Sequence, residues 1–296
     1  MRAAAIDLGK TRCRFVVSDA AAPVRRDGPG APGLAAPGGV DAALEAIVPL
    51  LDAAAHAIDV LGVGAAGAWA APEAARQFAG ELAVRTSARV AVASDVVTAH
   101  AGALVGSPGV LLIAGTGAAA LGVDARGVRL VDGWGPELGD LGSGSWLGRE
   151  GIRAVLRAGA GLGPATALSA ALDAHIAPSP DVHAWLAGGG PAARHLATFA
   201  PVVLDAAADG DDAAAGIAAE AVRLLTASAA AAAGADSRVA LHGGLTDHVW
   251  FRTALETALV SASRTVVPAR GDALDGALLL AARTDLPHER YVHRAG

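Results

Sequence analysis

Two short apolar runs around a glycine-containing turn occur twice in the sequence, and this duplication constrains the fold more than any other feature. The first turn is Asp7–Thr11 and the second is Gly115–Gly117. Apolar runs that flank a glycine turn are typical of a β-hairpin. We therefore predict two structurally related halves without obvious sequence identity. The runs that would form the hairpin strands are Ala3–Ile6, Cys13–Val17, Val110–Ala114 and Ala118–Val123.

Each hairpin is followed by segments with strand and helix patterns. After the first hairpin, the Pro- and Gly-rich stretch Gly28–Gly39 is expected to be a loop, and buried strands are expected at 60–63 and 90–93. After the second hairpin, residues 146–233 have a mostly helical pattern. Hairpins followed by βα units predict an α/β protein in which a mixed sheet is flanked by helices. The predicted helices are Val40–Ala57, Pro72–Val84, Val96–Leu104, Trp250–Leu259 and Asp272–Ala282, and the further strands are Gly127–Val131, Arg238–Leu241 and Thr265–Val267.

The length of the chain predicts two domains. A chain of 296 residues exceeds the usual size of one compact core. The second hairpin begins just after residue 108, so we expect an N-terminal domain of residues 1–108 and a C-terminal domain of residues 109–296 with a helical insertion. The last helix of the second domain is expected to pack back on the first.

The composition excludes several classes of protein. The net charge is −6 and no stripe of Lys and Arg is present, which argues against a nucleic-acid partner. Cys13 is the only cysteine, so an intramolecular disulfide and a cysteine-ligated cluster within one chain are excluded. The alanine-rich stretch Ala227–Ala235 is shorter than the roughly 20 residues that span a bilayer. We therefore expect a cytoplasmic protein without a membrane partner.

Both glycine turns offer backbone amides that can hold an anion. In the first turn, Gly9 allows a close approach, Asp7 can hold Mg²⁺ through water, and Lys10 and Thr11 can donate to phosphate. Taken alone, each turn is better explained as an ordinary hairpin turn. Their repetition in two related halves favours a pair of turns that clamp a polyphosphate, the second through Gly115, Thr116 and Gly117.

Asp95 stands between a buried strand and a helix. An Asp at this place is most often a helix N-cap. A carboxylate at the C-terminal end of a strand also points into the crevice where α/β sheets bind ligands. There it can act as a general base that accepts a hydroxyl proton during phosphoryl transfer. The two roles are compatible with each other.

Two further segments carry candidate binding residues. The glycine-rich stretch 132–144 contains Trp134, which can stack on a sugar face, and Asp140, which can accept from sugar hydroxyls. Its alternative is a loop that packs through Trp134 and caps the next helix with Ser143 or Ser145. The stretch His242–Leu245 has small residues that let a flat ring lie against the backbone, or it is a plain strand-to-helix turn.

The order of these segments resembles the BadF/BadG/BcrA/BcrD ATPase family, and in particular its N-acetylglucosamine kinase-like members in the actin–hexokinase superfamily. The resemblance covers nearly the whole chain and is most specific over Asp132–Glu150, which is similar to the family's Gly-Trp-Gly…Gly-Asp-Glu-Gly-Ser…Trp-Ile-Gly-Arg signature. It implies two ribonuclease-H-like domains hinged around a cleft. The iron–sulfur branch of the family is excluded by the single cysteine.

The resemblance also implies roles for individual residues. It makes Asp95 the catalytic residue and places Asp7, the expected metal residue of the first turn, in the family's first phosphate motif with Gly9 and Thr11. It implies ATP and Mg²⁺ as cofactors and a homodimer as the assembly. ATP binding is expected at Asp7, Gly9, Lys10, Thr11, Gly115, Thr116, Gly117, Gly243, Gly244 and Leu245, and sugar binding at Gly67, Asp95, Gly133, Trp134 and Asp140.

Two positions depart from the family pattern near the expected sugar site. Leu141 stands where the family usually has Glu, and the loop Gly28–Gly39 lacks the Asn that reaches the sugar in the kinases. We therefore predict an ATP-dependent kinase for an amino sugar such as N-acetylglucosamine or glucosamine, acting at O6, and leave the sugar open. The alternatives are a non-catalytic sugar or nucleotide sensor and a bare ATPase of the same fold.

Overall fold

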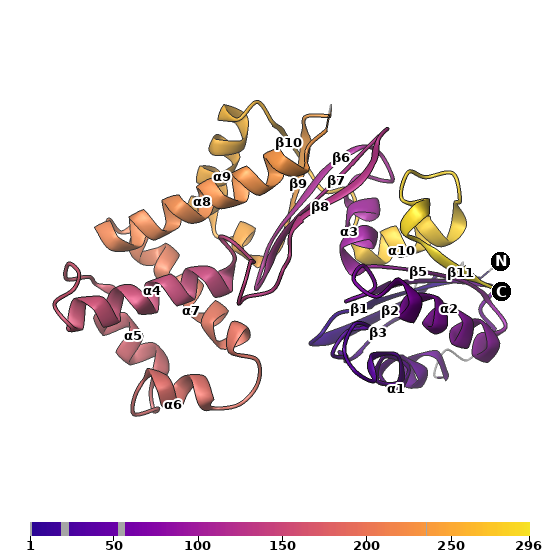
Figure 1. Ribbon diagram of the computed structural model, residues 1–296, viewed down its shortest axis with the longest axis horizontal. Helices are drawn as coiled ribbons and strands as arrows, with labels where there is room; N and C mark the ends of the chain where they lie inside the picture. Colours follow the sequence, from indigo (N-terminus) through magenta and orange to yellow (C-terminus); the bar gives the residue numbers. More distant parts are fainter. Residues whose placement is uncertain (1, 19–23, 53–56, 235) are drawn as a thin grey trace. The chain divides into compact units, whose positions relative to one another are not determined.

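A computed structural model describes residues 2–18, 24–52, 57–234 and 236–296. The chain forms two compact units (Figure 1). Unit 1 comprises Met1–Pro108, Val123–Val128 and Pro268–Gly296, and unit 2 comprises Gly109–Gly122 and Arg129–Val267. Residues 268–296, which the sequence places in the C-terminal domain, thus belong to the unit built by the N-terminal residues.

Unit 1 contains a six-stranded mixed sheet in the order β11-β5-β4-β1-β2-β3. The predicted hairpin is present, because β1 and β2 are antiparallel with Asp7 opposite Arg14. Strands β4 and β5 continue the sheet in parallel with β1. The strands are β1 (Ala3–Leu8), β2 (Arg12–Ser18), β3 (Val24–Pro29), β4 (Val60–Ala65), β5 (Arg89–Ala93) and β11 (His293–Ala295).

Neither of the two edge strands of this sheet, β3 and β11, was predicted from the sequence. Strand β3 occupies the start of the stretch Gly28–Gly39, so the expected loop begins only after Pro29. Its residues Val24–Asp27 are exposed and mostly charged, and charges together with a proline are how edge strands avoid further pairing. Strand β11 has three residues, which is too short for an alternating pattern.

Helices cover both faces of the sheet of unit 1. Successive side chains of a strand point to opposite faces, and in β1 Ile6 joins one core whereas Ala5 joins another. Helices α1 (Gly39–Asp52) and α2 (Pro72–Thr86) pack on the first face, whereas α10 (Ala273–Ala282) packs on the second. Residues 53–56 of the predicted helix Val40–Ala57 lie outside the described residues.

Helix α10 approaches its neighbours through glycines. It lies beside α3 (Asp95–Ala103) in Figure 1. A Cβ atom at Gly62 of β4 would overlap the Ala277 carbonyl oxygen, and one at Gly276 would overlap the Thr98 carbonyl oxygen. Helix α10 therefore fits closely against both β4 and α3, and the C-terminal residues complete the core of unit 1.

Apart from β11, unit 2 repeats the strand order of unit 1. Its five-stranded sheet has the order β10-β9-β6-β7-β8, with β9 parallel to β6 and to β10. In both sheets the three strands that come first in sequence lie together at one edge, and the later parallel strands extend the other side. The strands are β6 (Gly109–Ala114), β7 (Ala118–Asp124), β8 (Gly127–Asp132), β9 (Arg238–His242) and β10 (Thr265–Val267). The predicted duplication is therefore present as repeated topology.

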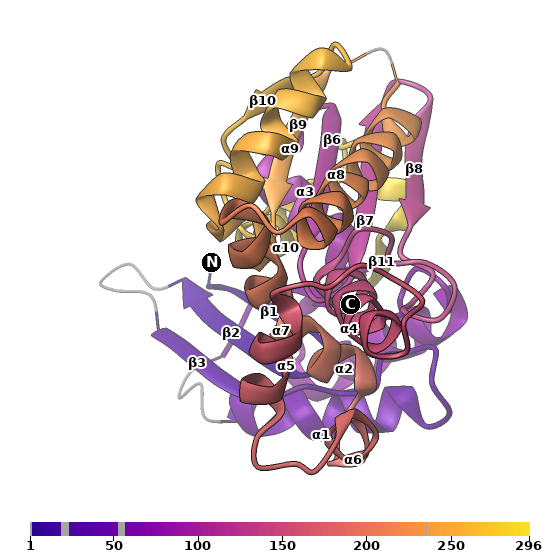
Figure 2. The ribbon, with the colours of Figure 1, turned by 90° about the vertical axis from the view of Figure 1, so that its left-hand side faces the viewer.

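The helices of unit 2 build one large core on its sheet, and α8 and α9 lie over the sheet in two views (Figures 1 and 2). Helix α8 has 21 residues and is the one helix in the described ranges that is long and apolar enough to span a membrane. It extends well beyond the alanine-rich stretch Ala227–Ala235 that was considered from the sequence. One such helix is weak evidence for a span, and α8 contributes Ala214, Ala218, Ala221 and Leu225 to the core. The helices are α4 (Gly144–Gly159), α5 (Leu168–Ile176), α6 (Val182–Ala187), α7 (Ala192–Ala208), α8 (Asp212–Ala232) and α9 (Val249–Ser261).

Candidate active site

Backbone hydrogen bonds fix the first glycine turn to strand β2 and to the segment after β3. The Gly9 amide donates to the Arg12 carbonyl oxygen at 3.0 Å, and the Ala31 amide donates to the Gly9 carbonyl oxygen at 3.1 Å. A Cβ atom at Gly30 would lie 2.5 Å from the backbone of Lys10 and Thr11, so only glycine fits there. The amides of Lys10 and Thr11 donate to no residue in the described ranges, which leaves them available to an anion.

Side chains on this turn carry charge. Lys10 is exposed and is the only lysine in the sequence. Thr11 is exposed beside it. The turn therefore presents one cation, one hydroxyl and two unused amides, which is a suitable set for phosphate oxygens.

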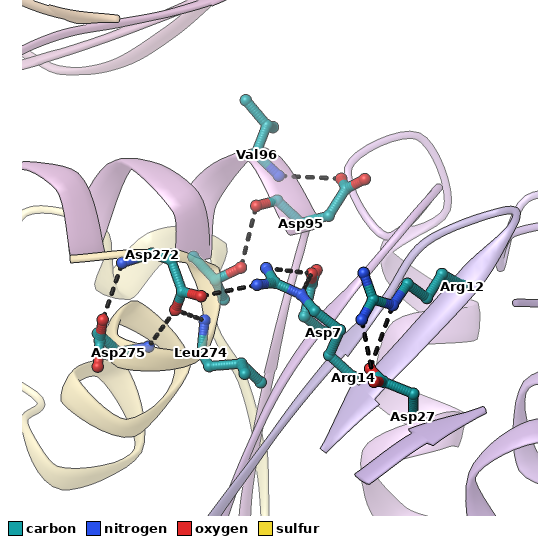
Figure 3. A network of polar contacts seen from close by, with 10 residues as sticks. Asp7, Arg12, Arg14, Asp27, Asp95, Val96, Asp272, Leu274 and Asp275 are labelled. Atoms are coloured by element: carbon teal, nitrogen blue, oxygen red, sulfur yellow. Dashed lines mark hydrogen bonds and ion pairs between the residues drawn. The ribbon is translucent and has the colours of Figure 1, made fainter. Parts of the chain in front are cut away.

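Asp7 is bound by an arginine from the facing strand (Figure 3). Arg14 donates to Asp7 Oδ2 through Nη2 at 2.7 Å and through Nε at 3.0 Å. The same guanidinium donates through Nη1 to Asp272 Oδ2 at 2.7 Å. Both acids and Arg14 are half-buried. Arg14 thus joins the hairpin to the start of α10.

The charges of this trio stabilise one another. Burial by itself would lower the pKa of Arg14, but the hydrogen bond and charge of Asp7, with the charge of Asp272, raise the pKa above its ordinary value. Burial would raise the pKa of Asp272, but the Asp275 and Leu274 amides and the charge of Arg14 hold the pKa below its ordinary value. Asp272 also forms a capping box with Asp275 at the start of α10.

Arg14 and Asp272 were not identified from the sequence. A weak signal exists for Arg14, because it stands between Cys13 and Phe15 in a strand whose other residues are mostly buried. Asp272 has only the pattern of a helix cap, and its pairing depends on a contact across 258 residues.

Asp95 is the first residue of α3, and Ser94 occupies the N-cap position. The Ser94 hydroxyl donates to Asp95 Oδ1 at 2.9 Å. The Val96 amide donates to the same oxygen at 2.9 Å (Figure 3). The other oxygen, Oδ2, accepts no hydrogen bond from the part of the chain that is described. The carboxylate is therefore oriented through one oxygen, and the second oxygen is available to a substrate hydroxyl.

Burial dominates the electrostatics of Asp95. Desolvation raises the pKa of its carboxyl, Asp7 raises the pKa further, and the Ser94 hydroxyl, the Val96 amide and Lys10 lower it. The net direction is upward, toward the value of a general base that works near neutral pH. Because the charges of Asp7 and Lys10 both act on Asp95, the fold brings these three predicted residues together within unit 1.

The metal role of Asp7 can be tested against the residues present. The described ranges contain no group of three or more His, Cys, Asp or Glu residues that could hold a metal. Mg²⁺ in phosphoryl-transfer sites needs only one or two carboxylates, because water and phosphate supply the other ligands. Arg14 occupies Oδ2 of Asp7 and leaves Oδ1 available. Asp7 therefore fits a water-mediated Mg²⁺ ligand.

Gly67 lies in a tight backbone contact after β4. Its φ is +83°, and a Cβ atom there would lie 2.9 Å from the amide nitrogens of Leu34 and Ala35. The Leu34 amide donates to the Ala66 carbonyl oxygen at 2.8 Å. The Asn-free loop after Pro29 thus packs against the turn that carries Gly67, and Gly67 is required for that approach.

The second glycine turn, in unit 2, is fixed through its carbonyl groups. The Gly144 and Ser145 amides at the start of α4 donate to the carbonyl oxygens of Gly115 and Thr116 at 2.8 and 3.1 Å. Ser143 is the N-cap of α4. The sequence had offered Ser143 and Ser145 as the alternatives for this cap. The amides of Thr116 and Gly117 donate to no described residue. This turn offers backbone donors without any charged side chain.

Gly243 lies directly on the second turn. Its φ is +108°, and a Cβ atom there would lie 2.5 Å from the Ala114 carbonyl oxygen and 2.9 Å from the Gly115 amide nitrogen. The two predicted ATP segments of unit 2 are therefore adjacent. Gly244 is exposed, whereas Leu245 is 7% exposed and belongs to the core of unit 2. The Leu245 side chain therefore anchors the segment.

Asp132 organises the glycine-rich loop. It is 3% exposed and accepts from the Gly133 and Asp140 amides at 2.8 Å and from the Leu141 amide at 2.7 Å. Trp134 is 64% exposed, so it does not pack in the core and its ring is available for stacking. The sequence pattern did not assign this organising role to Asp132.

Asp140 lies beside the second turn. It accepts from the Ala118 amide at 3.3 Å, and a Cβ atom at Gly117 would lie 2.9 Å from its Oδ2. Its φ is +52°, a conformation that Asp tolerates better than most residues. Unit 2 thus brings together Gly115, Gly117, Gly243 and the predicted sugar ligand Asp140.

Known proteins support a common ancestry for this arrangement. The model of the BadF/BadG/BcrA/BcrD ATPase family matches residues 5–281. A curated N-acetyl-D-glucosamine kinase from Dictyostelium discoideum is 46% identical over 65 residues, which are 22% of this chain and 20% of that protein. The chain therefore matches about a fifth of the length of that relative.

Solved structures extend the similarity to the whole chain. A proposed N-acetylglucosamine kinase from Chromobacterium violaceum is 27% identical with a TM-score of 0.77, and the match covers 95% of this chain and 98% of that one. A second proposed N-acetylglucosamine kinase, from Porphyromonas gingivalis, is 20% identical with a TM-score of 0.71 over 97% and 98% of the two chains. The second similarity concerns the fold alone.

Proposed function

The chain belongs to the BadF/BadG/BcrA/BcrD ATPase family, and we propose that within it the protein is an ATP-dependent sugar kinase. The acceptor in this proposal is an amino sugar such as N-acetylglucosamine or glucosamine, and the attacked position is O6. The relative from D. discoideum and the structure from C. violaceum, both described as N-acetylglucosamine kinases, support this choice.

The observation that carries the proposal is the pair formed by Asp95 and the first turn. A carboxylate with one fixed and one available oxygen lies within electrostatic range of Lys10 and Asp7. Phosphoryl transfer requires a base for the acceptor hydroxyl and donors for the transferred phosphate. Unit 1 provides both at the carboxyl ends of the parallel strands β1 and β5 of one sheet.

In the proposed reaction, Asp95 Oδ2 accepts the proton of the sugar 6-hydroxyl as its oxygen attacks the γ-phosphorus of ATP. A new oxygen–phosphorus bond forms, the bond between the γ-phosphorus and the β–γ bridging oxygen breaks, and ADP leaves. The amides and side chains of Lys10 and Thr11 bind phosphate oxygens in unit 1, and the amides of Thr116 and Gly117 do so in unit 2. Mg²⁺, held through water by Asp7, would neutralise charge on the phosphates.

Trp134 and Asp140 are proposed as sugar contacts. The exposed ring of Trp134 suits stacking on the apolar face of a pyranose, and the Asp140 carboxylate accepts from hydroxyls. We propose that Gly67 and Gly133 act through their backbone, because both have positive φ angles that a side chain disfavours. A homodimer is also proposed, and light scattering of the purified protein at micromolar concentration tests it.

The test is the rate of ADP release with Mg²⁺-ATP over a panel of amino sugars and hexoses. Replacement of Asp95 by Asn should lower kcat about 10²- to 10⁴-fold, because the general base is lost, while ATP binding is retained. Asp41→Asn is the matched control, since it removes an exposed carboxylate from the first turn of α1 in the same unit. Near-normal turnover of Asp95→Asn contradicts the assignment. Turnover unaffected by any sugar indicates a bare ATPase, and binding without turnover indicates a sensor.

Stability gives an independent readout for the same variant. The folded pKa of Asp95 is raised, so the stability linked to this group is present below its unfolded pKa and is lost as pH rises through the folded value. Asparagine carries no charge to desolvate at neutral pH. Asp95→Asn should therefore melt at an equal or higher temperature than the wild type at pH 7, and this gain should shrink toward pH 4. A lower melting temperature at pH 7 would show that the lost turnover reflects misfolding.

A further inference from the structure

A cavity in unit 1 adjoins the proposed base without being used by the reaction described above. Its volume is about 350 Å³, and its lining includes Trp69, Arg76, Ser94, Arg290, Tyr291 and His293. Ligand pockets begin at about 300 Å³, so this cavity has the size for one monosaccharide or for a large substituent. Its wall touches the catalytic group, because Ser94 donates to Asp95 Oδ1 at 2.9 Å.

The cavity has an aromatic wall. Trp69 and Tyr291 stack with their ring centroids 4.5 Å apart and their planes 5° from parallel. Trp69 lies two residues after Gly67 in the segment that follows β4, and Tyr291 precedes β11, which pairs with β5. Two segments distant in sequence are thus joined in one rigid wall.

Besides the aromatic pair, Ala68, Pro72 and Ser94, the lining carries two arginines and a histidine. Arg76 pairs with Glu73, whose side chain is 86% exposed, and an ion pair this exposed contributes little and is easily exchanged. Arg290 is exposed and forms no ion pair with any residue in the described ranges. Burial and the charge of Arg76 lower the pKa of His293, against the opposing effect of Glu73, so this imidazole is a neutral donor at pH 7. The nearby Glu289 is already paired with Arg294.

An aromatic wall beside two guanidinium groups, an imidazole and a hydroxyl fits an anionic organic group. Guanidinium groups bind carboxylate or phosphate through two parallel hydrogen bonds, and aromatic rings bind the apolar part of the same ligand. A neutral sugar would leave Arg290 without an ion-pair partner among the described residues and Arg76 with only its exposed pair to Glu73. We propose that this cavity binds an acidic substituent of the acceptor, so that the substrate is an amino sugar carrying a carboxylate or a phosphate.

This inference rests on the proposed kinase function, and the experiment separates the two. Rates of ADP release are measured with N-acetylglucosamine and with two acidic counterparts, N-acetylmuramic acid for a carboxylate and N-acetylglucosamine 1-phosphate for a phosphate. The proteins are the wild type, the double variant Arg76→Gln/Arg290→Gln, and the control Arg283→Gln. Arg283 is an arginine of the same unit that pairs with Asp285 and does not line the cavity.

We expect the wild type to use at least one acidic sugar with a kcat/KM at least tenfold above that of N-acetylglucosamine. A charge-assisted hydrogen bond contributes about 1.5–3 kcal/mol, or roughly 10- to 150-fold, so the double variant should lose this preference and keep its activity on the neutral sugar within about twofold. Arg283→Gln should behave as the wild type. Equal use of neutral and acidic sugars by the wild type, or a preference that survives in the double variant, overturns the proposal.

Calorimetric titration of the three sugars in the absence of ATP keeps the two proposals distinguishable. Binding of an acidic sugar that depends on the two arginines, without phosphorylation of any sugar, would support the cavity and contradict the kinase. Phosphorylation of N-acetylglucosamine without binding of either acidic sugar would support the kinase and contradict the cavity. An acidic sugar that alters this rate without competing with N-acetylglucosamine and without being phosphorylated would make the cavity an effector site, which contradicts its role for the acceptor.

Discussion

The two glycine turns occupy the same place in two sheets of the same strand order, yet they differ in what they present. The turn Asp7–Thr11 has an exposed lysine, a hydroxyl and a carboxylate held by Arg14. The turn Gly115–Gly117 has no charged side chain and is fixed by the amides of α4 and by Gly243. Each leaves two consecutive amides unused among the described residues. The shared topology therefore determines the backbone donors, and the local sequence decides whether charge is added to them.

This difference predicts opposite sensitivities for the two turns. A turn that acts through its backbone depends on close contacts that a single methyl group disrupts. A turn that acts through charge depends on ionic strength and on side-chain identity. Substitutions in one turn at a time can therefore separate the two modes.

The largest effect is expected from Gly243→Ala. The new Cβ atom would lie 2.5 Å from the Ala114 carbonyl oxygen in a backbone conformation that favours glycine. Strain and overlap of this kind cost about 3 kcal/mol, which corresponds to a decrease in melting temperature of roughly 6–12 °C. Scanning calorimetry measures the melting temperature. Titration calorimetry should also show that the variant binds ATP more weakly.

Gly244→Ala is the matched control for that variant. The nearest atom to its added Cβ would be 4.0 Å away, so its stability should stay within about 0.5 kcal/mol of the wild type. Equal effects of the two substitutions would show that the second turn does not depend on the contact at Gly243.

A smaller effect is expected from Lys10→Met, which removes the charge of the first turn. The kcat/KM for ATP should fall about 10- to 100-fold, because a charge-assisted hydrogen bond to phosphate is lost. The effect should shrink as salt is raised from 50 to 500 mM, since Lys10 is exposed and its charge is screened. Arg12→Met is the control, because that neighbouring cation is already paired with Asp27. An effect of equal size in both variants would show that Lys10 adds only general positive charge and makes no specific contact with phosphate.

The smallest effect is expected from Arg14→Gln, measured as acid unfolding. The folded pKa of Asp272 is lowered, so its stabilising contribution is present above the unfolded pKa of about 3.9 and is lost as pH falls through the folded value. Loss of Arg14 raises that folded pKa. The variant should therefore unfold at a higher pH than the wild type and be about 1 kcal/mol less stable at pH 7. An unchanged acid midpoint would mean that the helix cap alone sets the pKa of Asp272.

The sequence predicted the parts of the molecule that depend on local pattern. The hairpins, the parallel strands after them and the position of Asp95 at the start of the helix that follows β5 all follow from short apolar runs and their boundaries. Strand β3 was missed because edge strands carry charge in place of the alternating pattern. The contact of Gly117 with Asp140 and the contact of Gly243 with Ala114 join segments that no local pattern relates.

Arg14 shows the same limit within the site. Its two carboxylate partners lie 7 and 258 residues away, and only the nearer one follows from the register of a hairpin. The role of Asp272 depends on α10 returning to the face of the sheet that carries Arg14. Packing of this kind is decided by the whole core, so the sequence predicts the helix and its return to the first domain but not the contact of Asp272 with Arg14.

The return of α10 to unit 1 has a consequence for the order in which the protein is made. On a ribosome that adds about 5–20 residues per second, Asp272 emerges some 13–50 s after Arg14, because 258 residues separate them. During that interval the second face of the first sheet lacks α10, and Asp7 and Arg14 lack their third partner. Unit 2 can be synthesised in full before unit 1 is complete. The nascent chain therefore does not have the complete charge network around Asp7 until its last helix has been translated.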